Sequence, residues 1–167
     1  TNHFGEIEYT AKIAKPDISI ITNIGDSHLE YLINRVGVYK EKSSLFSETI
    51  NNGGTIFVNT DDPILKVETR KVKDKITYGF KGTPNVKGKI LGYTIDGRTK
   101  LKVSYINKEF SIELPIWGLS NAQNVLAAVS IALYLGLSVG KIISGLKKLQ
   151  QVKGRLYVEK NESKILI

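Results

Sequence analysis

Two short apolar runs, residues 18–22 and 55–59, constrain the fold of this chain more than any other feature. Apolar and β-branched residues at consecutive positions are typical of strands buried on both faces, which occur mainly in parallel sheets. A helical pattern over residues 34–50 connects the two runs, and Asn52-Gly53-Gly54 is a typical end for such a helix. This alternation of strand and helix predicts an α/β fold with a mostly parallel sheet flanked by helices.

Residues 76–117 follow a different pattern, in which apolar and polar residues alternate and Asp96-Gly97 is a strong hairpin signal. This stretch predicts an antiparallel β-meander of three or four strands, inserted into the sheet or packed beside it. Other elements are expected as helices over residues 5–15, from Asp62-Pro63 onward, over 121–135 and over 138–149, and as a hairpin from residue 155.

Length and composition indicate a single cytoplasmic domain. The chain has 167 residues, 41% of them apolar, and no cysteine, so disulfides and thiolate metal sites are excluded. No apolar run reaches the roughly 20 residues of a membrane span, and the N-terminus lacks the pattern of a signal peptide. The sequence ends within an apolar run, which favours a piece of a longer protein.

The formal charge of +8 is concentrated in one segment. Eleven basic and three acidic residues lie between Lys66 and Lys102, and the rest of the chain has thirteen of each. Lysines on the solvent side of strands protect sheet edges from other chains, so one interpretation is a solvated basic sheet face. Contact with a polyanion is the other, but few aromatic residues are interleaved there for stacking on bases.

His28 and Lys42 are candidates for catalysis or metal binding. His28 follows a buried strand, at the sheet edge where ligands bind, and is either a metal ligand or general base or a surface histidine that caps a turn. Lys42 shares a helix face with apolar residues, which disfavours the charged ammonium and favours an amine that takes up carbon dioxide as a carbamate. Alternatively, its stem covers the core edge while its ammonium reaches water.

Asn121 and Asn124 are three residues apart at a predicted helix start, and their amides match the polar edge of adenine. The alternative is that Asn121 is an N-cap. Capping also explains Asp61-Asp62 better than a paired-carboxylate metal site. Residues 82–89 and 136–141 have the wrong spacing for a phosphate-binding loop, and Ile90 or Ile142 replaces the required hydroxyl residue.

Taken together, these stretches resemble the Mur ligase family over residues 2–155. The pattern around His28, Thr-Asn-Ile-x-x-x-His-Leu-Glu, resembles that family's second magnesium site, and Lys42, fourteen residues on, matches its carbamoylated lysine. Asn121 and Asn124 match its adenine motif, with Ser120 where histidine is usual. Arg155 in Lys-Gly-Arg matches an arginine near the ATP phosphates.

The stretch Asn2 with Gly5-Glu6-Ile7 looks most like the branch that adds D-alanyl-D-alanine to UDP-N-acetylmuramoyl-tripeptide. The resemblance implies a truncated central domain of the P-loop-NTPase type over residues 1–154, without its phosphate loop, and the start of a C-terminal domain or link over 155–167. It implies ATP and Mg²⁺ as cofactors, the muramoyl peptide and D-alanyl-D-alanine as substrates, and a monomer without nucleic acid or membrane partners. Asn2 and Asn23 are candidate substrate contacts, and this piece alone is expected to be inactive.

Two alternatives differ from this interpretation. One is another Mur-family ligase, acting on cyanophycin, folylpolyglutamate or a different peptidoglycan precursor. The other is a non-catalytic module that binds RNA through residues 66–102. Steeply salt-dependent RNA binding without nucleotide binding would favour the second alternative.

Overall fold

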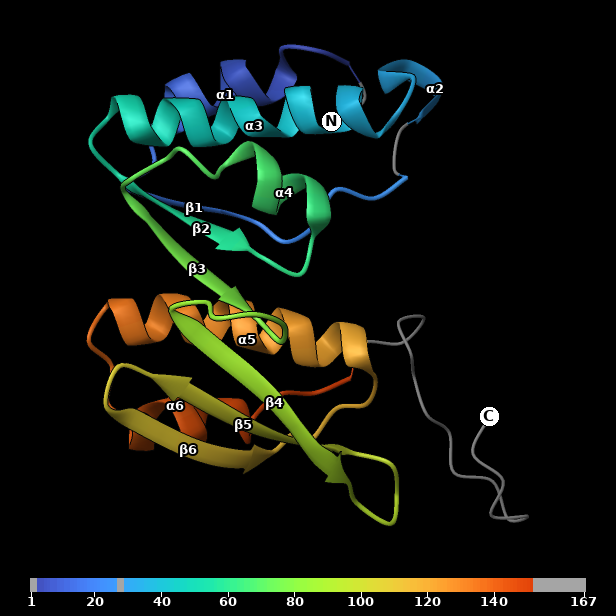
Figure 1. The fold of residues 1–167 in the computed structure, drawn as a ribbon, viewed down its shortest axis with the longest axis vertical. Helices are drawn as coiled ribbons and strands as arrows, with labels where there is room; N and C mark the ends of the chain where they lie inside the picture. The colour runs from blue at the N-terminus through green and yellow to red at the C-terminus, as the bar shows by residue number, and fades with distance from the viewer. Residues whose placement is uncertain (1–2, 27–28, 152–167) are drawn as a thin grey trace. The chain divides into compact units, whose positions relative to one another are not determined.

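The computed structural model describes residues 3–26 and 29–151 of the chain (Figure 1). The chain divides into two compact units, with the boundary between Lys87 and Gly88. This boundary was not predicted from the sequence, whereas the predicted division after residue 154 lies outside the described residues.

Six strands of the described ranges form one sheet in the order β1-β2-β3-β4-β5-β6. The pairs β1–β2, β2–β3 and β3–β4 are parallel, and β5–β6 is antiparallel. The prediction of a mostly parallel sheet flanked by helices is therefore confirmed. The strands are β1 (Ile18–Ile21), β2 (Thr55–Asn59), β3 (Lys75–Gly79), β4 (Val86–Tyr93), β5 (Thr99–Tyr105) and β6 (Lys108–Glu113).

The antiparallel part of the sheet begins later than the sequence predicted. β3 was expected to open the β-meander, but it runs parallel to β2 and to β4. The connection from β2 to β3 contains a helix and is long enough for a parallel crossover. The connection from β3 to β4 is short, and these strands overlap only at Tyr78↔Val86 and Gly79↔Lys87. Alternation along one strand does not reveal the direction of its neighbours.

Four helices lie in the described residues of the first unit, and local signals explain where three of them begin or end. The Asn34 side chain caps the longest helix by accepting from Gly37 N at 3.0 Å. The predicted cap at Asp62 is confirmed, with Pro63 as the first helical residue. The first helix ends before Pro16, at Lys15 with a φ of 44°. The helices are α1 (Glu6–Ala14), α2 (Leu29–Leu32), α3 (Arg35–Asn51) and α4 (Pro63–Glu68).

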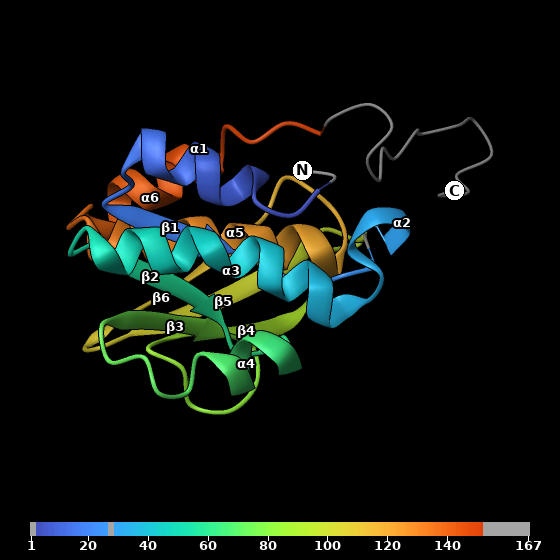
Figure 2. The same cartoon turned by 90° about the horizontal axis from the view of Figure 1, so that it is seen from above.

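The core of the first unit lies between the sheet and α3. Figure 2 shows α1 and α3 side by side over the strands, and α3 contacts both β1 and β2. Burial of these apolar side chains is the main source of stability for the unit. The core consists of Ile21, Ile24, Leu32, Val38, Phe46, Ile56, Val58 and Leu65.

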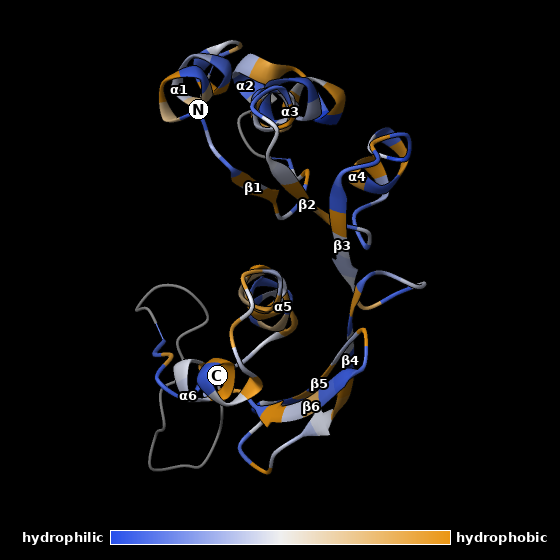
Figure 3. Ribbon diagram, turned by 90° about the vertical axis from the view of Figure 1, so that its left-hand side faces the viewer, coloured by the Kyte–Doolittle hydropathy of each residue, from blue (hydrophilic) through white to orange (hydrophobic). Residues whose placement is uncertain are grey.

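The second unit packs α5 (Leu119–Tyr134) against β5 and against α6 (Val139–Leu146). Most residues of α5 are apolar, and the hydropathy colours show apolar positions on this helix (Figure 3). Gly136, with a φ of 79°, turns the chain between the two helices, and Ser138 caps α6. The two predicted helices are confirmed, although α5 begins two residues earlier than expected. None of the helices in the described part of the chain is long and apolar enough to cross a lipid bilayer.

Tyr78 in β3 is 1% exposed, and its hydroxyl has no hydrogen-bond partner among the described residues. We expect Tyr78→Phe to raise the free energy of unfolding by about 1–3 kcal/mol, because it removes an unsatisfied buried polar group. Burial, with smaller effects from Asp61 and Asp62, raises the pKa of the Tyr78 phenol. The folded chain therefore holds the phenolic proton more tightly than the unfolded chain does, so stability falls as the pH rises above about 10.

Urea denaturation at about pH 8 and about pH 10.5 measures both effects of this substitution. Tyr78→Phe should be more stable than the unmodified chain at both values and should lose less stability between them. Tyr93→Phe is the matched control, because Tyr93 is 61% exposed. Equal stability of the Tyr78→Phe chain and the unmodified chain at both pH values would show that the hydroxyl is satisfied.

Candidate functional site

The loop after β1, residues 22–26, is held at three consecutive positions by side chains from other elements. Asn59 Nδ2 donates to the Thr22 carbonyl at 2.8 Å. Lys42 Nζ donates to the Asn23 carbonyl at 3.3 Å, and the Ile24 N–H donates to Asp62 Oδ2 at 2.8 Å. This loop, called the β1 loop below, lies at the carboxyl end of a parallel strand, where open α/β sheets bind their ligands.

Lys42 approaches the β1 loop from α3. The helix face on which it lies buries Val38 and Phe46, which are 0% and 4% exposed, while Lys42 itself is half-buried. The predicted inward-facing lysine is thus found at the edge of the core. Its amine is bound to the carbonyl of Asn23, another predicted site residue. Lys40 is exposed and lies over the Phe4 ring, with its amine 5.8 Å from the ring centre, so it takes no part in this contact.

Polar side chains at the carboxyl end of β2 organise this edge of the sheet. Asn59 Oδ1 accepts from Asp61 N at 2.9 Å, and Asp61 accepts from the N–H groups of Phe80 and Lys81 at 2.6 and 2.8 Å. A Cβ at Gly79 would lie 3.0 Å from Asp61 Oδ1, so only glycine fits there without a shift. The capping role predicted for this pair is confirmed for Asp62, which caps α4, whereas Asp61 binds the segment after β3 instead.

Glu41, beside Lys42 on α3, was missed by the sequence analysis. It is 2% exposed, and its two carboxylate oxygens accept from Gly5 N at 2.7 Å and Ile7 N at 2.8 Å. The N-terminus of α1 has no side-chain cap of its own, and a negative charge there interacts favourably with the helix dipole. One signal was present in the sequence, because a helix start at glycine needs an acceptor from elsewhere. Glu41 thus holds the start of α1, while its neighbour Lys42 holds the β1 loop.

The far end of the β1 loop is joined to the start of α3 by an exposed ion pair. Arg35 donates to both carboxylate oxygens of Asp26, at 2.7 and 2.6 Å. The hydrogen bonds from Arg35 lower the pKa of that carboxyl, so Asp26 stays ionised at neutral pH. Exposed pairs add little stability, so the contribution of this pair is mainly to orientation.

The adenine candidates lie in the first turns of α5, in the second unit. α5 begins at Leu119 after Gly118, so the alternative that Asn121 is the N-cap is wrong. Instead, Asn121 Nδ2 donates to the Trp117 carbonyl at 2.7 Å, while Asn124 is exposed. The helix starts early because Gly118 takes a φ of 90°, a conformation that turns the chain before Asn121.

Asn2, His28 and Arg155 lie outside the described residues, so the predictions for them stay predictions. Within residues 3–26 and 29–151, no group of three or more His, Cys, Asp and Glu side chains is placed to hold a metal ion. The metal site predicted from the sequence consists of His28 and Lys42, and Lys42 is the residue of that pair that the structure describes.

Several residues of the basic segment have structural contacts. The amine of Lys75 donates to three backbone carbonyls at and after the end of α4, at 2.6–3.2 Å. Arg98 forms ion pairs with Asp96 and Glu113, both at 2.8 Å. Lys75 and Arg98 thus have partners within the chain.

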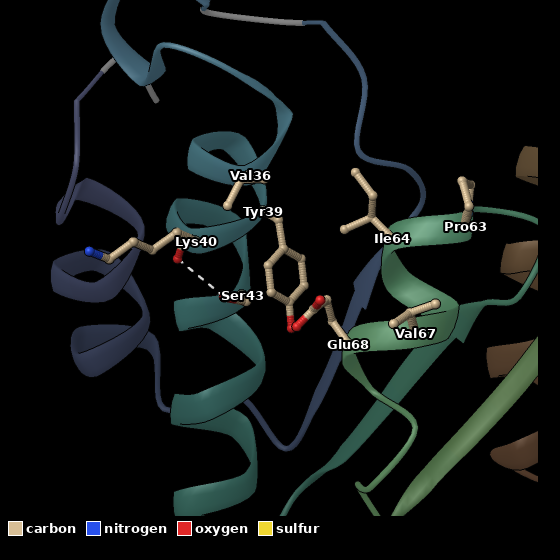
Figure 4. Close-up of a pocket in the computed structure, with 8 residues that line it drawn as sticks. All are labelled: Val36, Tyr39, Lys40, Ser43, Pro63, Ile64, Val67 and Glu68. Carbon is tan, nitrogen blue, oxygen red and sulfur yellow. Dashed lines mark hydrogen bonds between the residues drawn. The ribbon is translucent and has the colours of Figure 1, made fainter.

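A cavity of about 560 Å³ opens between α3 and α4, and Lys42 and Asn23 are not among the residues that line it (Figure 4). The Tyr39 ring points into it, and Glu68 lies opposite on α4. Burial and then the charge of Glu68 raise the pKa of Tyr39. The cavity was not predicted from the sequence, because its lining comes from two helices. It is lined by Val36, Tyr39, Lys40, Ser43, Pro63, Ile64, Val67 and Glu68.

Two known proteins that are similar to the chain are both ligases. The chain is 31% identical over 156 residues to the UDP-N-acetylmuramoyl-tripeptide–D-alanyl-D-alanine ligase of Haemophilus influenzae, covering 93% of this chain and 34% of the relative. It is 35% identical over 144 residues to the UDP-N-acetylmuramate–L-alanine ligase of Aquifex aeolicus, covering 85% and 31%. The chain thus spans about a third of the length of these curated relatives.

Solved structures agree with this likeness. A crystal structure of MurF from Acinetobacter baumannii matches with a TM-score of 0.84 and 30% identity, over 97% of this chain and 35% of the other. MurF from Thermotoga maritima in complex with ADP matches with a TM-score of 0.83 and 25% identity, over 96% and 37%. The family model described as Mur ligase middle domain matches residues 1–132. The chain therefore belongs to the Mur ligase middle-domain family.

Proposed function

We propose that the complete protein is an ATP-dependent ligase that joins D-alanyl-D-alanine to UDP-N-acetylmuramoyl-tripeptide. The observation that carries this proposal is the contact of Lys42 Nζ with the Asn23 carbonyl, at the carboxyl end of β1, in a chain of the Mur ligase family. The relatives named for this reaction match nearly the whole chain at about 30% identity. The reaction would run in the cytoplasm, as the sequence predicted.

The proposed reaction has two steps. The carboxylate of the muramoyl peptide attacks the γ-phosphate of ATP, which releases ADP and forms an acyl phosphate. The amine of the incoming dipeptide then attacks the acyl carbon, phosphate leaves, and an amide bond forms with loss of a proton. Charge builds on phosphoryl oxygens in the first step, so the protein contributes mainly by positioning and cationic stabilisation.

Lys42 would act as a carbamate in this proposal. Its neutral amine adds carbon dioxide and releases one proton, and the nitrogen keeps one N–H. That N–H still has an acceptor in the Asn23 carbonyl, the partner of the amine in the structure. The two carbamate oxygens would then lie beside the β1 loop. A lysine that is fixed at its nitrogen presents these oxygens in a defined direction.

Magnesium, the second proposed cofactor, fits this site only when Lys42 carries the carbamate. Without the carbamate, the described residues offer no cluster of metal-binding side chains, and the charged amine of Lys42 repels a cation. The carbamate supplies hard oxygen ligands of the kind that magnesium prefers, with His28 as the proposed neighbour. Bound there, the ion would neutralise charge on the phosphoryl oxygens. Asn121, Asn124 and Arg155 remain the proposed ATP contacts, and Asn2 and Asn23 the proposed substrate contacts.

A second candidate has one observation in its favour. The L-alanine ligase of Aquifex aeolicus has the higher identity, 35%, although over a smaller share of this chain. The two candidates differ in both the muramoyl substrate and the amine. Therefore an assay with each substrate pair separates them.

The test is release of phosphate from ATP by the complete protein with each substrate pair. We expect release that depends on UDP-N-acetylmuramoyl-tripeptide together with D-alanyl-D-alanine, and the amide product by mass spectrometry. Omitting either substrate should stop turnover. Turnover only with UDP-N-acetylmuramate and L-alanine would reject the first proposal in favour of the second, and no turnover with either pair would reject both.

A further inference from the structure

We propose that Asp62 is a positioning residue for Lys42, acting through the peptide group between Asn23 and Ile24. This inference rests on the proposed function and deepens it, because it concerns how the site lysine is held. Asp62 lies 38 residues from Ile24 in the sequence and contacts it only because the ends of β1 and β2 are neighbours. In the described part of the chain, the Asp62 carboxylate accepts from backbone N–H groups and Lys42 donates to a backbone carbonyl, so the effect of Asp62 on the lysine is indirect.

A single peptide group connects Asp62 to Lys42. The Asn23 carbonyl accepts from Lys42 Nζ at 3.3 Å, and the N–H of the same peptide group donates to Asp62 Oδ2 at 2.8 Å. The peptide group is planar and, in the trans form found here, its C=O and N–H point in opposite directions. Fixing the N–H on Asp62 therefore fixes the direction of the carbonyl that receives Lys42. Hydrogen bonds in series also polarise one another, which strengthens both.

The two oxygens of Asp62 have separate roles. Oδ1 accepts from Ile64 N at 3.0 Å and Leu65 N at 2.9 Å, which caps α4. Oδ2 accepts from Ile24 N, in the β1 loop. Asp62 is 9% exposed, so a lost acceptor is not readily replaced by water. The cap needs one oxygen, whereas the loop contact needs the second.

Asp62→Asn separates these roles. Asparagine is about as good an N-cap as aspartate, so its one oxygen can still cap α4. Its NH₂ group then faces the Ile24 N–H, and two donors cannot form a hydrogen bond. The peptide group loses its anchor while the helix keeps its cap.

Asp61→Asn is a matched control. Asp61 is the neighbouring residue, and its carboxylate also accepts from two backbone N–H groups, those of Phe80 and Lys81. Both belong to the segment after β3, whereas the Asp62 carboxylate accepts from the β1 loop. The same chemical change is thus made one residue away, and a general loss of order at the sheet edge would affect both variants equally.

The experiment uses the complete protein and two readouts. Amide hydrogen exchange of residues 22–26 should be about tenfold or more faster in Asp62→Asn and unchanged in Asp61→Asn. In the ligation assay, kcat of Asp62→Asn should fall about 10- to 100-fold, with KM for D-alanyl-D-alanine within about threefold, as for residues that orient a site group. Asp61→Asn should keep kcat within about threefold of the unmodified enzyme.

Unchanged exchange at residues 22–26 in Asp62→Asn would overturn the inference, whatever the assay shows. Equal losses of kcat in both variants would also overturn it, since they would indicate a structural effect. If the unmodified protein does not ligate while the exchange result holds for Asp62→Asn alone, the proposed function fails but the anchoring of the peptide group stands. The two failures are therefore distinguishable.

Discussion

Under the proposed function, Lys42→Ala in the complete protein should lower kcat for ligation by about 100- to 1,000-fold, the usual effect of removing one group that stabilises developing charge. The substitution removes the nitrogen that binds the Asn23 carbonyl and that would carry the carbamate. Lys42→Arg should be equally impaired, because a guanidinium keeps the charge and the hydrogen bond but does not take up carbon dioxide. Steady-state phosphate release with both substrates measures these effects. Added bicarbonate should not restore activity to either variant.

Lys40→Ala provides the control for this experiment. Lys40 lies two residues away on α3, is exposed and contacts the Phe4 ring, so its removal should change kcat by less than about threefold. Full activity of Lys42→Arg would contradict the carbamate, and full activity of Lys42→Ala would exclude Lys42 from the site.

Phe46→Ala should lower the free energy of unfolding by about 3–5 kcal/mol, the usual cost of truncating a buried phenylalanine. Phe46 is 4% exposed and belongs to the core between α3 and the sheet, one helical turn from Lys42. The side chains around the cavity lose their contacts with the phenyl ring and do not move far enough to fill the space. Urea denaturation of the purified chain measures the change.

Ser47→Ala is the control for this substitution. Ser47 is the next residue on α3 but is exposed, so its replacement should change stability by less than about 0.5 kcal/mol. A loss below about 1 kcal/mol for Phe46→Ala would mean that α3 does not pack on the sheet as described. In that case the approach of Lys42 to the β1 loop would lose its structural basis.

Features encoded by neighbouring residues could be predicted from the sequence. The apolar runs identified β1 and β2, and Asp62-Pro63 identified the start of α4. The inward face of Lys42 followed from helix periodicity. Each of these rests on residues within one or two helical turns, where backbone preference and burial agree.

Features that depend on contacts between distant segments could not be predicted. β3 was expected to open an antiparallel meander but runs parallel to β2, because the connection between these two strands contains a helix, a feature that lies outside the strand itself. Glu41 holds the start of α1, 34 and 36 residues away, and nothing in its local pattern identifies that partner. Asn121 was assigned as a possible cap because the early turn at Gly118 was not recognised.

The same limit applies to the site. The sequence suggested Asn23 and Lys42 as separate candidates, and only the structure joins them through one hydrogen bond. The role of Asp62 was predicted for the helix that it caps, but its second oxygen reaches the β1 loop across the sheet edge. Helix caps are local, whereas the anchoring of a loop depends on which strands become neighbours.

Carbon-13 NMR of the complete protein in labelled bicarbonate tests the carbamate on Lys42 most directly. The wild-type protein should show a carbamate resonance that disappears in Lys42→Ala and persists in Lys40→Ala. Absence of that resonance from the wild-type protein, or its persistence in Lys42→Ala, would contradict the carbamate on Lys42.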